Sequence, residues 1–249
     1  MTKAGSLFAM MKQGFLLAFI AMSLICLSSC GGSKQPSVPA ILQVVQVDFS
    51  TGAQGWVAGF ADYPAGQETF FQLASGIQQL PVPLDPAKTG FSISGINHSA
   101  DLFMFLKSKI TGLKPNTVYQ ASFHVEFATN APQNCAGVGG PPGEGVFVKA
   151  GASVAEPQAV LQSDGFLRMN VDKGQQAVGG KDAIVIGNVA NSSTDCLNPV
   201  FQTKVLDSSS AFSVQTDSTG SLWLLVGTDS GFEGATSLYY QQAKVTFTP

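Results

Sequence analysis

The sequence contains little charge. Charged residues make up 12% of it, about half of the ~25% that is typical of globular proteins. Lys and Arg number 13 against 16 Asp and Glu, and Arg168 is the single arginine. With no basic patch to neutralise phosphates, nucleic acid is excluded as an expected partner. The same shortage argues against electrostatic attachment to anionic lipid.

The sequence also lacks the local motifs of common enzymes. It contains no Gly-Xaa-Ser-Xaa-Gly elbow, no Walker loop, no dinucleotide fingerprint and no His-Glu-Xaa-Xaa-His pair. Its two histidines are His98 and His124. The sequence therefore does not indicate an enzyme and favours a non-catalytic role.

The N-terminus carries an apolar run that is too short to span a membrane. Residues 14–27 are mostly apolar, follow Lys3 and Lys12, and end at Leu27, directly before Ser28-Ser29-Cys30. A membrane-spanning helix needs ~20 residues, more than this run contains. This arrangement resembles the bacterial lipobox. It implies a signal peptide at 1–29, lipidation and a membrane anchor at Cys30, and a flexible tether at 30–40. Gly31 favours the outer membrane of the cell envelope, in a cell that has one. An ordinary cleaved signal is the alternative.

Cys26 lies in the signal peptide and Cys30 is the predicted lipidation site, so Cys135 and Cys196 are the two remaining cysteines. Both lie in turn-rich stretches, and two leftover thiols in an exported protein usually pair. We therefore expect a disulfide bond between them. Two separate thiols are the alternative.

The rest of the chain is rich in predicted strands and nearly free of helical periodicity. In 117–127, apolar and polar residues alternate, which is typical of a strand with one buried face. The 101–110 segment is apolar on both faces up to Leu106, as expected of a central strand. With no linker inside 41–249, we predict a single all-β domain. The predicted strands are 41–49, 68–73, 91–95, 101–110, 117–127, 145–151, 165–171, 183–190, 200–205, 211–215, 220–228 and 237–247.

Several short motifs resemble those of galactose-binding-like jelly-roll domains, the group that includes many carbohydrate-binding modules. Asp48-Phe49 leads after a Gly-containing turn to Trp56, and the 112–119 segment is similar to the turn into a central strand of that group. The resemblance implies a two-sheet antiparallel jelly-roll sandwich. The sequence departs from the group at Gln241-Gln242, where an Asp is common, and this weakens a transferred calcium site.

A possible polar cluster depends on strand pairing. If 101–110 and 117–127 form a hairpin, His98 and Asp101 lie near His124 and Glu126, where the four side chains can bind a metal or act as an acid–base pair. Solvated polar groups with local hydrogen bonds are the alternative.

Two further sets of candidates lie in loops. Asp229 and Glu233 offer oxygen ligands for a structural calcium ion, although turn chemistry also explains this loop. Trp56, Phe60 and Tyr63 are candidate exposed rings for stacking on a sugar, with core packing as the alternative.

The leading hypothesis is an exported, lipid-anchored, non-catalytic module that binds glycan or another cell-envelope ligand. An envelope structural or assembly protein that recognises protein partners is the alternative. A metal-dependent hydrolase that uses the two histidines is less favoured.

Overall fold

A computed structural model describes residues 42–249 of the chain. The predicted signal peptide at 1–29, the lipidation of Cys30 and the tether at 30–40 lie outside the described residues and stay predictions. Within 42–249, the only helix is the short 3₁₀ turn Phe49–Thr51, and every other regular element is a strand.

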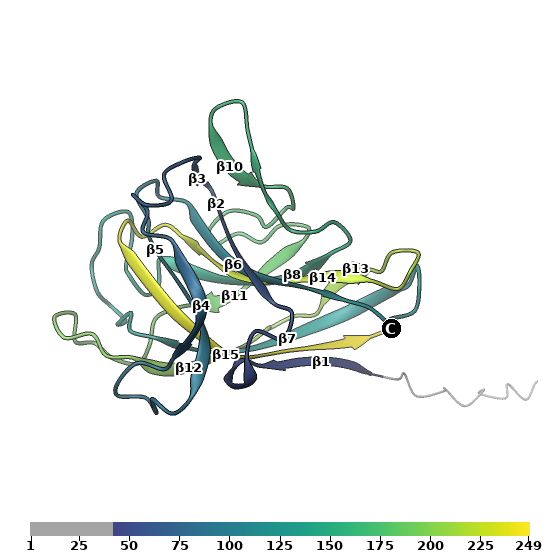
Figure 1. Ribbon diagram of the computed structural model, residues 1–249, viewed down its shortest axis with the longest axis horizontal. Helices are drawn as coiled ribbons and strands as arrows, with labels where there is room; N and C mark the ends of the chain where they lie inside the picture. Colours follow the sequence, from purple (N-terminus) through teal and green to yellow (C-terminus); the bar gives the residue numbers. More distant parts are fainter. Residues whose placement is uncertain (1–41) are drawn as a thin grey trace, which may run out of the picture. The chain divides into compact units, whose positions relative to one another are not determined.

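Two large antiparallel sheets pack face to face (Figure 1). The seven-stranded sheet has the order β12 (Gln202–Asp207), β7 (Val118–Thr129), β15 (Ala235–Thr248), β5 (Thr89–Ile96) and β4 (Ala74–Gln79), with β1 (Gln43–Asp48) on β15 and β13 (Phe212–Gln215) on β7. The five-stranded sheet has the order β11 (Ala183–Asn188), β8 (Val146–Ser153), β14 (Leu222–Ser230), β6 (Leu102–Ile110) and β2 (Val57–Ala61). The predicted all-β jelly-roll sandwich is confirmed.

A third, small sheet projects from the body of the sandwich (Figure 1). Its order is β3 (Tyr63–Pro64), β10 (Phe166–Met169) and β9 (Ala159–Leu161). A second apolar cluster lies next to this sheet. In it Met169, at the end of β10, and Val171, which follows β10, pack with Phe103 and Phe105.

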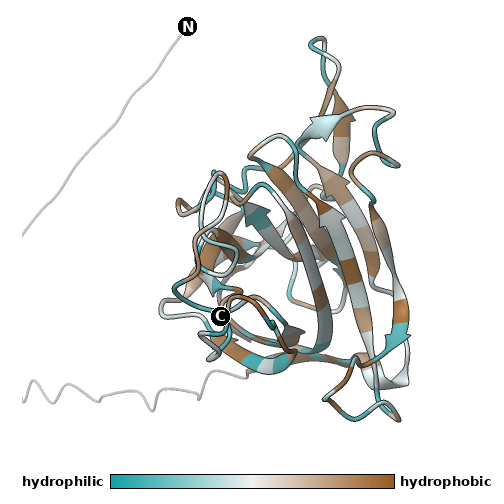
Figure 2. Cartoon of the chain, turned by 90° about the vertical axis from the view of Figure 1, so that its left-hand side faces the viewer, coloured by the Kyte–Doolittle hydropathy of each residue, from teal (hydrophilic) through white to brown (hydrophobic). Residues whose placement is uncertain are grey.

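The main core lies between the two large sheets, and alternation along β7 builds one wall of it. Tyr119, Ala121, Phe123, Val125 and Phe127 are all buried there, as predicted. Figure 2 shows hydrophobic residues concentrated along the strands. Burial of these aromatic side chains is the main source of stability in such a sandwich.

Strand β6 is covered on both faces, which confirms its predicted central position. Leu102, Met104 and Leu106 face the main core, while Phe103 and Phe105 face the second cluster. Two apolar faces leave no alternation in the sequence, because both sides of the strand exclude water.

The hairpin between 101–110 and 117–127, on which the possible polar cluster depends, does not form. β6 pairs with β14 and β2, whereas β7 pairs with β15, β12 and β13. The connection between them passes from one sheet to the other, and local sequence does not distinguish this crossover from a hairpin turn.

The predicted strand at 68–73 is also wrong, since this segment forms turns, and β2, β3, β4 and β9 were not predicted. β4 is an edge strand that is exposed on most of its length. It therefore shows no alternation of apolar and polar residues.

The predicted disulfide is confirmed between Cys135 and Cys196, 61 residues apart. It joins the loop after β7 to the loop after β11. The bond thereby links connections of the two large sheets.

Candidate functional site

The structure does not bring the four predicted polar residues together. His124 and Glu126 lie on β7, where the His124 Nδ1 is 2.8 Å from the Asp207 carboxylate on β12. His98 and Asp101 lie in the loop between β5 and β6. Because β6 and β7 belong to different sheets, this loop is not brought beside His124 and Glu126. No three His, Cys, Asp or Glu side chains within residues 42–249 are placed to hold a metal ion, so this geometry gives the hydrolase hypothesis no metal centre.

Glu126 instead lines a small polar pocket on the seven-stranded sheet. The pocket is about 210 Å³ in volume, and Asp48, Gln241 and Gln242 also line it. A register shift between Tyr240 and Gln242 marks a bulge in β15 at this point. A bulge redirects side chains along a strand, and the two consecutive glutamines contribute their amides to the same pocket.

The predicted exposure of Trp56 and Tyr63 is wrong. Trp56 is 6% exposed and packs edge-on against Phe49, with ring centroids 6.0 Å apart. Tyr63 is 4% exposed, and its hydroxyl donates to the Glu68 carboxylate. Burial and the Glu68 charge raise the pKa of Tyr63 to about 12. Phe60 is partly buried against the main core.

The aromatic side chain that is exposed near this region is Phe70. It is 58% exposed, and its ring stacks on His98 with centroids 4.2 Å apart and an interplanar angle of 27°. Buried Phe71 lies edge-on to both rings, at 5.8 Å from Phe70 and 5.3 Å from His98. We call the stacked rings of Phe70 and His98 the Phe70–His98 platform.

Buried hydrogen bonds fix the loop that carries His98. Asn97 is 1% exposed, and its Nδ2 donates to the carbonyl oxygens of Ser230 and Phe232, each at 2.9 Å. Its Oδ1 accepts the Ser99 N–H at 3.0 Å. Ala100 takes a φ of 58°, a strained conformation that persists only where the surroundings enforce it. The platform is therefore pre-organised.

A carboxylate belongs to the same turn as the platform. Backbone N–H groups of Glu68 and Gly66, together with the Tyr63 hydroxyl, hold the pKa of Glu68 below its ordinary value. Tyr63 connects Glu68 to the aromatic group, because its ring lies 5.5 Å from that of Phe71. Glu68 thus supplies a charged hydrogen-bond acceptor beside an apolar ring.

The calcium hypothesis for Asp229 and Glu233 does not fit the structure. Asp229 is fully buried on β14, and its Oδ2 lies 2.8 Å from the Lys173 Nζ and 3.0 Å from the Lys149 Nζ. Glu233 is exposed in the following loop. The Lys149 and Lys173 amino groups occupy the positions beside this carboxylate that a cation needs.

Asp101 stands at the edge of this buried charge cluster. A cavity of about 320 Å³ is lined by Asp62, Asp101, Arg168 and Lys173 among others. Burial raises the pKa of Asp101 to about 6, and the neighbouring Asp229 and Asp62 charges add to the effect of burial while Lys173 opposes it. Asp101 therefore titrates near neutral pH.

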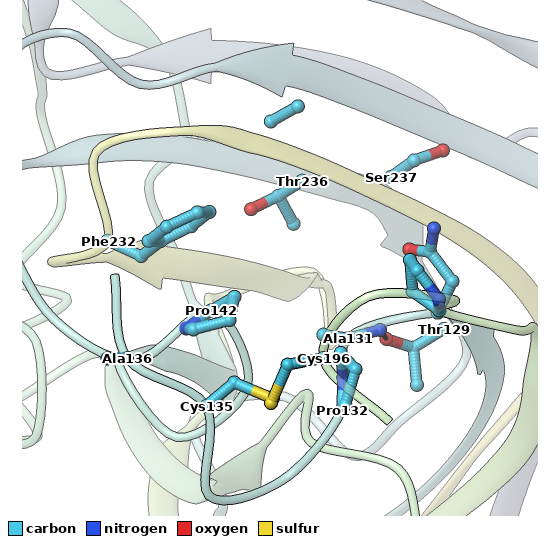
Figure 3. Close-up of a pocket in the computed structure, with 13 residues that line it drawn as sticks. Thr129, Ala131, Pro132, Cys135, Ala136, Pro142, Cys196, Phe232, Thr236 and Ser237 are labelled. Atoms are coloured by element: carbon cyan, nitrogen blue, oxygen red, sulfur yellow. Dashed lines mark hydrogen bonds between the residues drawn. A yellow bond between two sulfur atoms is a disulfide. The ribbon is translucent and has the colours of Figure 1, made fainter. Parts of the chain in front are cut away.

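A separate cavity of about 200 Å³ adjoins the disulfide (Figure 3). Phe232 and Thr236 lie on one side of it and the Cys135–Cys196 bond on the other. The side chains that line it include no acid, no base and no free thiol. Its polar side chains are neutral amide and hydroxyl groups, and no base lies among them to activate a hydroxyl.

The structure thus keeps three of the predicted site residues at one end of the sandwich and separates the others. Tyr63 and His98 meet through Phe71, and Asp101 ends the His98 loop. Phe70 was missed as a site residue. The adjacent pair Phe70-Phe71 was the available signal, since two neighbouring rings rarely both enter a core.

Comparison with known proteins shows only distant structural likeness. No protein-family model matches the sequence, and no curated protein matches it.

No helix of residues 42–249 has the length and apolar character that a membrane crossing requires.

Three solved structures illustrate this likeness. The enzymatically active domain of tailspike protein 4 of bacteriophage CBA120 is 12% identical, with a TM-score of 0.32 over 78% of this chain and 20% of that one. The K1 cleaved adhesin domain of Lys-gingipain from Porphyromonas gingivalis is 9% identical, with a TM-score of 0.35 over 83% and 98%. TmCBM61 in complex with β-1,4-galactotriose is 8% identical, with a TM-score of 0.36 over 79% and 92%. The chain spans only about a fifth of the tailspike domain, and similarity this low assigns neither a family nor a ligand.

Proposed function

We propose that this protein is an exported, lipid-anchored, non-catalytic module that binds glycan through the Phe70–His98 platform. The observation that carries the proposal is an exposed Phe ring, 58% accessible to solvent, that is held in place by His98 and buried Phe71. An exposed ring that is fixed in position offers a flat apolar face on which a ligand can pack.

The platform combines the two kinds of contact that a sugar needs. The apolar C–H face of a pyranose packs on an aromatic ring, and its hydroxyl groups need fixed polar partners. The His98 ring supplies polar nitrogen atoms beside Phe70, and Glu68, two residues before Phe70 in the same turn, supplies a carboxylate. Because buried Asn97 fixes the loop, little conformational entropy is lost on binding.

Export and lipid anchoring rest on the N-terminal pattern that ends in Cys30. The Cys135–Cys196 disulfide supports export, since such bonds persist in oxidising compartments. Mass spectrometry of the mature N-terminus tests the anchor directly. An N-terminal, acylated Cys30 is expected, and a mature chain that retains residues before it contradicts the proposal.

A glycan array followed by calorimetry on the best ligand tests the binding site. Phe70→Ala is expected to weaken binding at least about tenfold, the loss of ~1.4 kcal/mol. Phe201→Ala is the matched control, because Phe201 is a partly buried ring that packs on Tyr239 of the seven-stranded sheet. If Phe201→Ala abolishes binding and Phe70→Ala does not, the platform is the wrong site.

A protein partner is the second candidate, and β4 is the observation that favours it. This edge strand has the sequence ASGIQQ, is largely exposed and contains no charge. Edge strands usually carry charges that prevent further pairing, so β4 can accept an extended segment of another protein. Cross-linking in cells through Gln78 is expected to capture such a partner. A β4 edge that captures none leaves glycan binding as the function.

A further inference from the structure

Lys149 and Asp229 form an unusual buried pair on neighbouring strands. Lys149 lies on β8 opposite Gly227 of β14, two residues from Asp229. Both side chains are fully inaccessible to solvent, and the Lys149 Nζ is 3.0 Å from the Asp229 Oδ2. An amine and a carboxyl group are thus held in contact in a dry site.

The surroundings of Lys149 orient its nitrogen toward Asp229. Its Nζ donates to the carbonyl oxygens of Lys173 at 2.8 Å and Val178 at 2.9 Å. In a neutral amine these two acceptors use both N–H groups, so the lone pair faces Asp229. Burial lowers the pKa of Lys149, which favours that neutral form.

The surroundings of Asp229 prepare its carboxyl group for attack. Its Oδ2 accepts from the Lys173 Nζ at 2.8 Å and from the Gln176 N–H at 2.9 Å. Two fixed donors on one oxygen are the arrangement that stabilises a developing oxyanion. Oδ1 has no hydrogen-bond partner within the described residues and is free to accept protons and leave.

Lys173 remains a cation in this arrangement. Burial by itself lowers the pKa of Lys173, but Asp229 and Asp62 outweigh it and raise the pKa. Its Nζ also lies 3.1 Å from the Asp62 carboxylate and 4.9 Å from the centre of the Phe103 ring. Lys173 can therefore donate to Oδ2 while Lys149 acts as the nucleophile.

We propose that Lys149 and Asp229 join spontaneously in an intramolecular amide bond. The Lys149 Nζ attacks the Asp229 Cγ, and the N–C bond forms as the bond from Cγ to Oδ1 breaks. Before the attack, one proton passes from the Lys149 ammonium group to Oδ1, which leaves the neutral amine as the nucleophile. A second proton follows from the attacking nitrogen to Oδ1 as the Cγ–Oδ1 bond breaks, and Oδ1 departs as water. An ammonium and a carboxylate thus become an amide and one water molecule, with no oxidant, reductant or external group required.

Two physical effects favour this reaction over a lasting ion pair. The fold holds the two groups at contact distance, which replaces a bimolecular encounter by an intramolecular one. The amide also removes two charges from a site where both are costly. Asp62 then neutralises Lys173. The product is a covalent clamp between β8 and β14 that does not depend on whether the protein binds glycan.

Peptide mass spectrometry of the folded, purified protein tests the proposal. The fragments that contain Lys149 and Asp229 are expected as one joined species, lighter than their sum by one water. Lys149→Met is expected to eliminate that species. The ion pair of Lys107 and Glu156 is the matched control, since it is as close, at 2.6 Å, but its side chains are 12% and 37% exposed, and it should stay unjoined.

Two results overturn the inference. One is recovery of the two fragments separately, at unmodified masses, from protein with a native circular-dichroism spectrum. The other is joining of Lys107 to Glu156 to the same extent, which makes proximity alone, rather than the buried site, the cause.

Discussion

Alanine substitutions at Phe49 and Phe70 test whether a buried ring contributes to folding stability and an exposed ring to ligand binding. Phe49 is fully buried, and its ring lies edge-on to Trp56 at 6.0 Å and to Phe91 at 5.6 Å. Phe70 is 58% exposed and contacts His98 and Phe71. The same substitution to alanine at each site therefore removes the same atoms from opposite environments.

The expected loss at Phe49 follows from its contacts. Burying a Phe side chain contributes ~1.5–3 kcal/mol, and each edge-to-face aromatic pair adds ~0.5–1.5 kcal/mol. With the cavity that remains, Phe49→Ala should lower the free energy of unfolding by ~3–5 kcal/mol. Phe70→Ala should lower it by only ~1 kcal/mol, because its contacts with His98 and Phe71 involve a largely exposed ring, while it weakens glycan binding at least about tenfold.

Urea unfolding followed by tryptophan fluorescence measures both variants, because Trp56 lies against Phe49 and reports on that part of the core. Calorimetry with the glycan measures binding in the same preparations. Equal destabilisation by the two substitutions would refute the assignment of Phe49 to the core and Phe70 to the surface. Unchanged glycan affinity in Phe70→Ala would refute the platform alone.

Three further predictions concern the disulfide, the buried carboxylate and the loop anchor. Replacing Cys135 and Cys196 by alanine should lower the free energy of unfolding by ~4 kcal/mol, the chain-entropy value for a separation of 61 residues. Urea unfolding with and without reductant measures this loss. Reductant should destabilise the wild-type protein and leave the variant unchanged. Asp101→Asn should stabilise the protein at pH 8 and have little effect near pH 4. The pKa of Asp101 in the folded state, about 6, exceeds the ordinary value of 3.8, so the folded state binds the proton more tightly than the unfolded state. The stability of the wild-type protein therefore falls as the pH rises between these two values. Unfolding curves at the two pH values check this, and an equal effect at both contradicts it. Asn97→Ala should cost ~1–3 kcal/mol, because it removes the donor to the Ser230 and Phe232 carbonyl oxygens and the acceptor of the Ser99 N–H. It should also weaken glycan binding through His98; retained stability and affinity would contradict the anchor role.

The core was the part of the fold most open to sequence reasoning. Alternation in β7 identified Tyr119 to Phe127 as one buried face, and the absence of alternation in β6 identified a strand covered twice. Both follow from the two-residue repeat of a strand, which is a local property. The pairing of Cys135 with Cys196 followed from elimination, since Cys26 lies in the predicted signal peptide and Cys30 is the predicted lipidation site.

The candidate site was less open to prediction. Trp56 and Tyr63 lie in a Gly-containing segment that suggested exposure, but Phe49 and Phe71 cover them. His98 and His124 are separated because β6 and β7 belong to different sheets. Turn residues 112–116 fit a hairpin and a crossover equally well.

The sequence by itself determined the strand-rich class, the main buried faces, the disulfide and the N-terminal pattern at Cys30, because each depends on local periodicity or composition. Only the tertiary structure decided which strands pair, that Phe70 rather than Trp56 faces solvent, and that Lys149, Lys173 and Asp229 meet in a dry site. The contact between Lys149 and Asp229 joins residues 80 positions apart in the chain, and the β1–β15 pairing joins residues still farther apart. Chain topology and packing create them, and no local pattern encodes them.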